Sequence, residues 1–119
     1  MTVLYVFIGG GVGSVLRYLI SMWSAPLNGS MQFPIGTLIC NLLGCVLIGM
    51  FNSMATRMGW DNELKLMLTV GLCGGFTTFS TFSNESLAML SNAQYASYAL
   101  YLVLSVIFGI LCVWFGMKL

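Results

Sequence analysis

Residues 71–86 concentrate the side chains that could handle an ion within an otherwise apolar sequence. Three glycines, four hydroxyls within five positions and a phenylalanine at every third position follow one another: Gly71, Gly74, Gly75; Thr77, Thr78, Ser80, Thr81; Phe76, Phe79, Phe82. Glycine weakens a helix by about 1 kcal/mol relative to alanine. In lipid, unwound backbone is tolerated only where it is buried in protein or lines a polar cavity. The segment therefore predicts a broken helix at membrane depth and, with it, an ion or substrate site.

Phe79 and Phe82 are three residues apart, so their rings share one face of a helix. One interpretation is an aromatic pair in the protein core. The other depends on the neighbouring hydroxyls of Ser80 and Thr81. Because the edge of an aromatic ring is positive, ring edges beside hydroxyl donors can solvate a small anion without any full positive charge.

Other polar residues interrupt the remaining apolar runs. Arg17 either snorkels to the membrane interface or forms an electropositive vestibule that attracts an anion. Asn41 and Thr37 lie one turn apart on one face, where they suit either hydrogen bonds between helices or a polar pathway. Tyr101 and Ser105 are spaced by four, which fits helix packing as well as a pore wall. The sequence leaves these alternatives open.

The elements that must position these residues are membrane-spanning helices. The chain has 119 residues, of which 59% are hydrophobic and 6% charged, with a mean hydropathy of +0.96; a soluble domain is about 25% charged. We expect one all-α membrane domain over 1–119, with spans of about 20 residues at 3–22, 34–55, 64–90 and 95–117. A polar turn is expected at 24–30. The net charge of +1 excludes nucleic acid as a partner.

The charges give little topological signal. The side that carries both termini has three basic and two acidic residues against one basic residue on the other: Arg57, Lys65, Lys118, Asp61 and Glu63 against Arg17. This weak bias permits insertion in both orientations. Four short helices are too few to enclose a roomy polar pathway, so we expect an oligomer. The Gly9 and Gly13 pair suits close helix packing, either between subunits or within one.

The sequence lacks nucleotide motifs and hydrolytic machinery, so we do not expect an enzyme. Four cysteines in apolar runs, with no histidine in the chain, are expected to be free buried thiols: Cys40, Cys45, Cys73 and Cys112. A small proton-coupled multidrug exporter would need an acidic residue in the first span, which instead carries Arg17. A non-transporting accessory subunit explains the hydrophobicity but not the broken helix.

Three segments resemble the Fluc (CrcB) family of fluoride channels. They are residues 9–18 (GGGVGSVLRY), 34–44 (PIGTLICNLLG) and 71–82 (GLCGGFTTFSTF), in the order that the family has them. The third is the most specific, because the run Thr-Thr-Phe-Ser-Thr-Phe after a glycine cluster is rare. The length and the four-span plan extend the resemblance over the whole chain.

The resemblance implies an antiparallel, dual-topology homodimer in the cell (inner) membrane, which exports fluoride passively through two separate pathways. It implies that Asn41 lines each pathway and that Phe79 and Phe82 coordinate fluoride by their ring edges. It further implies a structural sodium ion at the dimer centre, held by backbone carbonyls of both subunits, and a vestibule at Arg17. The remaining residues that it implicates are, for fluoride, Ser80, Thr81, Thr37, Tyr101 and Ser105, and for sodium, Gly74 and Thr77.

Overall fold

The computed structural model describes residues 2–28 and 33–119, which form helices joined by short connections. Four helical spans are long and apolar enough to cross a membrane: α1 (Thr2–Ser24), α2 (Ile35–Met58), the segmented third span Asn62–Ser91, and α6 (Tyr95–Lys118). The four expected spans are confirmed, although α2 continues three residues beyond its expected end. Of the turn expected at 24–30, Ser24 is still the last residue of α1, and residues 25–28 form the short 3-10 helix η1 (Ala25–Asn28). The last two residues of the expected turn lie outside the described ranges.

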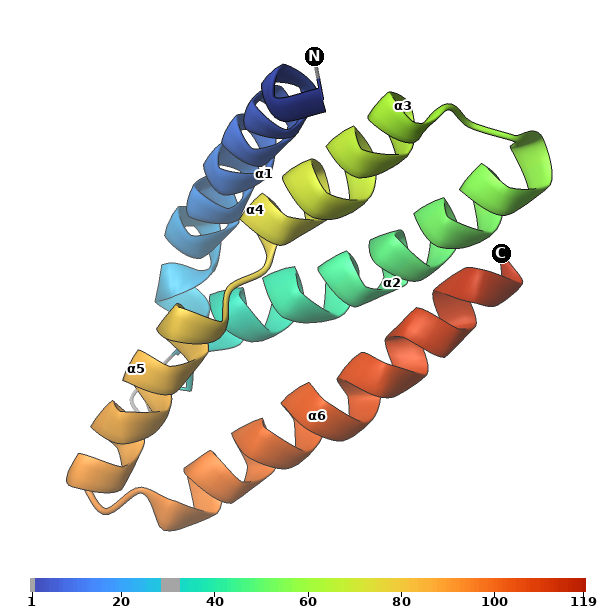
Figure 1. Ribbon diagram of the computed structural model, residues 1–119. Coiled ribbons are helices and arrows are strands. Elements are labelled where there is room, and N and C mark those ends of the chain that lie inside the picture. The colour runs from blue at the N-terminus through green and yellow to red at the C-terminus, as the bar shows by residue number, and fades with distance from the viewer. Residues whose placement is uncertain (1, 29–32) are drawn as a thin grey trace.

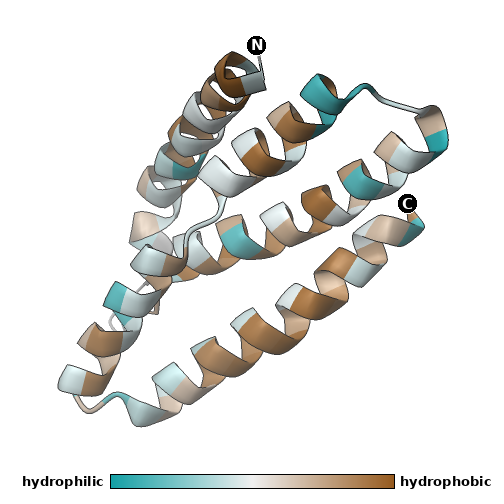
Figure 2. Ribbon diagram, viewed as in Figure 1, coloured by the Kyte–Doolittle hydropathy of each residue, from teal (hydrophilic) through white to brown (hydrophobic). Residues whose placement is uncertain are grey.

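The arrangement agrees with the expected four-span plan. Both termini lie toward the same end of the molecule as the α2–α3 connection, and the α5–α6 turn lies at the opposite end (Figure 1). Hydrophilic positions gather at the α2–α3 connection, and single ones interrupt α1, α2 and α5, whereas α6 is hydrophobic over most of its length (Figure 2). An apolar exterior of this kind suits contact with lipid tails.

The third span consists of several pieces. It begins with α3 (Asn62–Leu66), capped by Asp61, and continues as the π-helix η2 (Met67–Cys73) and the short α4 (Gly74–Phe76). Thr77 and Thr78 are extended, with φ of −95° and −153°, and α5 (Phe79–Ser91) follows. The predicted break is confirmed near the middle of the span, and we call these two extended threonines the break.

The glycines of the third span do not unwind it, contrary to the expectation that they would. Gly74 is helical, with φ of −64° and ψ of −40°. A Cβ atom on Gly75 would collide with the backbone of Gly10, and one on Gly13 would collide with the backbone of Leu72. These glycines instead allow α1 to approach the third span closely. The Gly9 and Gly13 pair therefore packs within one chain.

Close glycine contacts also join α2 to α6, which lie side by side (Figure 1). A Cβ atom on Gly49 would collide with the backbone of Val113, and one on Gly116 with the backbone of Val46. The four cysteines are free; two are fully buried and two are half-buried: Cys40 and Cys73, and Cys45 and Cys112. The expectation of free thiols is confirmed, and that of complete burial holds for the first pair.

Candidate functional site

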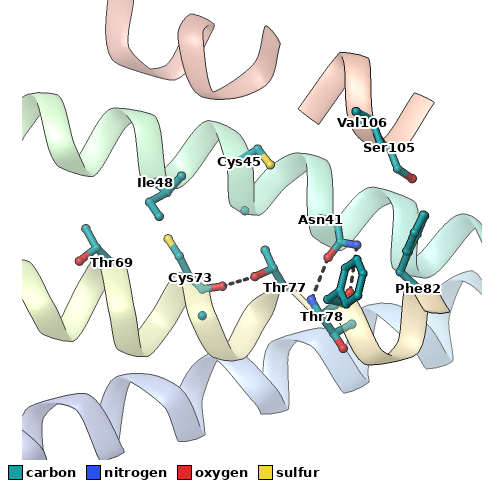
Figure 3. A pocket seen from close by; sticks show the side chains of 13 residues that line it. Asn41, Cys45, Ile48, Thr69, Cys73, Thr77, Thr78, Phe82, Ser105 and Val106 are labelled. Carbon is teal, nitrogen blue, oxygen red and sulfur yellow. Dashed lines mark hydrogen bonds between the residues drawn. The ribbon is translucent and has the colours of Figure 1, made fainter. Parts of the chain in front are cut away.

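Asn41 clamps the break from α2. The Thr78 amide donates to Asn41 Oδ1 at 2.9 Å, and Asn41 Nδ2 donates to the Thr78 carbonyl at 3.3 Å (Figure 3). In a continuous α-helix the Thr78 amide would instead donate to the carbonyl of Gly74. The side chain of Asn41 therefore takes over a helical hydrogen bond and leaves the Gly74 carbonyl without its helical partner.

Arg17, on α1, contacts α4 just before the break. Its Nε donates to the carbonyl of Gly75 at 3.1 Å, and its side chain is half-buried. The guanidinium thus lies at the C-terminal end of the first half of the span, where backbone carbonyls lack helical donors and a positive charge is favourable. Arg17 therefore forms a hydrogen bond to the third span and does not point only toward the membrane interface.

The hydroxyl of Thr78, at the end of the break, caps α5. Thr78 Oγ1 accepts from the Thr81 amide at 3.2 Å and lies 3.2 Å from Thr81 Oγ1 and 3.3 Å from Ser80 Oγ. Ser80 is exposed and Thr81 is half-buried. This cluster starts a new helix directly after the unwound residues, as Ser and Thr caps do.

A pocket of about 400 Å³ opens beside the break, between α2, the third span and α6 (Figure 3). We call it the break pocket. Six of the expected site residues line it: Asn41, Gly74, Thr77, Phe79, Phe82 and Ser105. The other five do not line it: Thr37, Ser80, Thr81, Tyr101 and Arg17. The structure thus brings the amide, the ring pair and one hydroxyl of the last span into a single cavity.

Aromatic rings lead from the break pocket into the protein. The ring centroids of Phe79 and Phe82 are 5.9 Å apart, and those of Phe82 and Tyr101 are 5.0 Å apart. Phe79 is 78% exposed, whereas Tyr101 is fully buried. The hydroxyl of Tyr101 donates to Glu85 Oε1 at 3.3 Å. Tyr101 therefore lies behind the pocket wall, in contact with it through Phe82. Thr37 is buried on α2, one turn before Asn41.

Sequence reasoning missed several residues of this region. Glu85 accepts the bond from Tyr101, and the sequence signal for it was its position as the only acidic residue inside the helical spans beyond their first turns. Cys45, Thr69 and Val106 line the break pocket, and no local pattern distinguishes them from residues that pack helices together. Ser105 Oγ is buried there without a hydrogen-bond partner, so its hydroxyl is available to a ligand.

The fold and the site define a small multi-pass membrane protein whose third span is broken beside a polar and aromatic pocket. Residues 4–117 match the family described as CrcB-like protein, Camphor Resistance (CrcB), and the chain belongs to this family. The family membership that the three sequence segments predicted is confirmed.

Three of its relatives carry the same name. A Phocaeicola vulgatus protein named Fluoride-specific ion channel FluC is 52% identical over 115 residues, covering 97% of this chain and 94% of that protein. A Bacteroides fragilis protein of the same name is 49% identical, covering 65% of this chain and 62% of that protein. A Serratia proteamaculans protein of that name is 51% identical, covering 66% and 61%.

Proposed function

We propose that this chain forms a fluoride-selective channel that conducts fluoride passively across the membrane, in line with the names of its relatives. The observation that carries the proposal is the break pocket, where an amide, two phenylalanine rings and a partnerless hydroxyl meet at membrane depth. A channel needs no reaction chemistry, in keeping with a site made of weak donors.

The pocket chemistry suits a small, strongly hydrated anion. Ser105 Oγ has a free proton to donate, and Asn41 has a second N–H beyond the one that bonds Thr78. The edges of Phe79 and Phe82 add a weak positive potential. These groups replace water around the anion without a fixed positive charge, so the ion is not trapped.

We further propose that two chains assemble as an antiparallel homodimer with two pathways. Phe79 is 78% exposed in the single chain although it lines the break pocket, and Gly74 is exposed beside it. A second copy against this side would cover the ring and close the pocket. Dual insertion follows from the weak charge asymmetry between the two ends.

A structural sodium ion fits the backbone at the break. The Gly74 carbonyl has lost its helical donor to Asn41, and Thr77 is extended. Carbonyl oxygens of unwound helices coordinate cations at membrane depth. Two copies meeting at this point would supply a pair of such carbonyls each. The chain would reside in the cell (inner) membrane and export fluoride down its gradient.

Reconstitution into sealed liposomes tests the proposal. Purified protein in vesicles loaded with fluoride should release it passively when the charge is balanced by an ionophore, and chloride-loaded vesicles should release little. Equal release of both anions would refute fluoride selectivity. Absence of fluoride release with a folded, inserted protein would refute the channel itself.

A further inference from the structure

Two buried serines of the last two helices keep their hydroxyls unpaired. Within the described residues, Ser86 Oγ and Ser105 Oγ are buried without partners, as is Gln94 Oε1 at the start of α6. The hydroxyls of three threonines behave differently, because each donates to the carbonyl four residues earlier, at 3.1, 2.7 and 2.9 Å: Thr56, Thr69 and Thr77. That local bond is the usual solution for a hydroxyl in a helix. Ser86 does not form this bond, so its hydroxyl proton can donate to a ligand.

Ser86 lies on the face of α5 that meets α6. Phe82, Glu85, Ser86 and Met89 follow the spacing of one helical stripe. Phe82 stacks on Tyr101, and Glu85 accepts a hydrogen bond from it, so this stripe faces α6. Ser86 is 8% exposed within it. Its hydroxyl is therefore enclosed beside the aromatic contact.

The two unpaired serines flank the ring contact from opposite sides. Along α5, Ser86 is one turn past Phe82, toward the turn at 92–94. Along α6, which runs back antiparallel, Ser105 is one turn past Tyr101, away from that turn. Ser97, one turn before Tyr101 on α6, is a second buried serine. A line from the break pocket past the rings thus begins at Ser105 and ends at Ser86.

We propose that Ser86 is a fluoride-binding residue, whose hydroxyl donates to the anion after it has passed the contact between Phe82 and Tyr101. The proposal rests on the fluoride-channel function proposed above and adds a second binding position to it, beyond the break pocket and toward the 92–94 turn. Beyond the aromatic contact, the hydroxyl of Ser86 is, among the described residues, a buried donor that has no partner. A fluoride that has crossed the contact can bind it, since a hydrogen bond to a charged group is stronger than one between neutral groups.

Three variants test the proposal in the full-length protein by fluoride efflux from liposomes. Ser86→Ala should lower fluoride flux roughly tenfold or more. Ser86→Thr retains a hydroxyl and should conduct within a few-fold of wild type. Thr56→Ala removes an exposed hydroxyl that bonds within α2 and should leave the flux unchanged. Size-exclusion elution of each variant, from the same preparation as the flux sample, reports assembly.

The alternative is a merely structural serine, and it predicts the opposite result. Removing a buried hydroxyl that has no partner is neutral or stabilising, so Ser86→Ala would then keep wild-type flux, and this outcome overturns the proposal. Equal loss in Ser86→Ala and Ser86→Thr would also overturn it, because shape rather than the proton would matter. A wild-type protein without fluoride flux would instead refute the channel function, which separates the two failures.

Discussion

Asn41→Asp separates the two tasks that the structure gives to this side chain. The carboxylate can still accept from the Thr78 amide, which now bonds Asn41 Oδ1 at 2.9 Å. It cannot donate to the Thr78 carbonyl, as Nδ2 does at 3.3 Å, and it has no proton for an anion in the break pocket. The substitution thus keeps half of the clamp and removes both donor functions.

The two consequences differ in size. The lost bond and the unpaired carbonyl of Thr78 cost about 1–3 kcal/mol of stability. The effect on fluoride is larger, because a carboxylate about 4 Å from the anion repels it by about 4 kcal/mol at an effective dielectric constant near 20. That repulsion lowers fluoride occupancy roughly a thousandfold. We therefore expect a protein that assembles but conducts almost no fluoride.

The assay measures fluoride efflux from liposomes with an electrode, beside size-exclusion elution of the same sample. Asn52→Asp is the matched control, because Asn52 is an exposed asparagine on the same helix outside the break pocket. It adds the same charge and should conduct like wild type. Flux of Asn41→Asp within a few-fold of wild type, in an assembled protein, would remove Asn41 from the pathway.

Three further predictions concern the rings, the glycines and the topology. Phe79→Ile and Phe82→Ile should assemble yet conduct fluoride poorly, because an aliphatic side chain fills the space without a positive ring edge; wild-type flux in both would reduce the rings to packing. Gly75→Ala should destabilise even the single chain, by about 1–3 kcal/mol, because its Cβ meets the backbone of α1. A Cβ atom on Gly74 meets open space in the single chain, so Gly74→Ala should leave the melting temperature of the monomer unchanged and weaken the dimer if Gly74 lies between two copies. A changed melting temperature of the monomer would contradict this. A single cysteine placed at 91–94, on a cysteine-free background, should label from both sides of intact cells, and one-sided labelling would exclude dual topology.

The sequence by itself determined the membrane class, the four spans and the presence of a break in the third. These features depend on local properties of the sequence. Apolar runs of about 20 residues cross a bilayer, and the residues that weaken or restart a helix are close neighbours in the sequence. Three segments together, residues 9–18, 34–44 and 71–82, indicated the family, and the match of residues 4–117 agrees. The sequence pointed to the glycines as the origin of the break, but Gly74 stays helical, and the extended residues are Thr77 and Thr78.

Only the tertiary structure decided which polar groups meet. Asn41 and Thr78 are 37 residues apart, and Arg17 and Gly75 are 58 apart, so no spacing rule links them. Their bonds form because α1 and α2 pack against the third span and supply donors and acceptors that the interrupted helix lacks. The unpaired hydroxyl of Ser86 is equally invisible in sequence. Whether a buried polar group has a partner depends on every neighbour in three dimensions, and that is decided only when the helices pack.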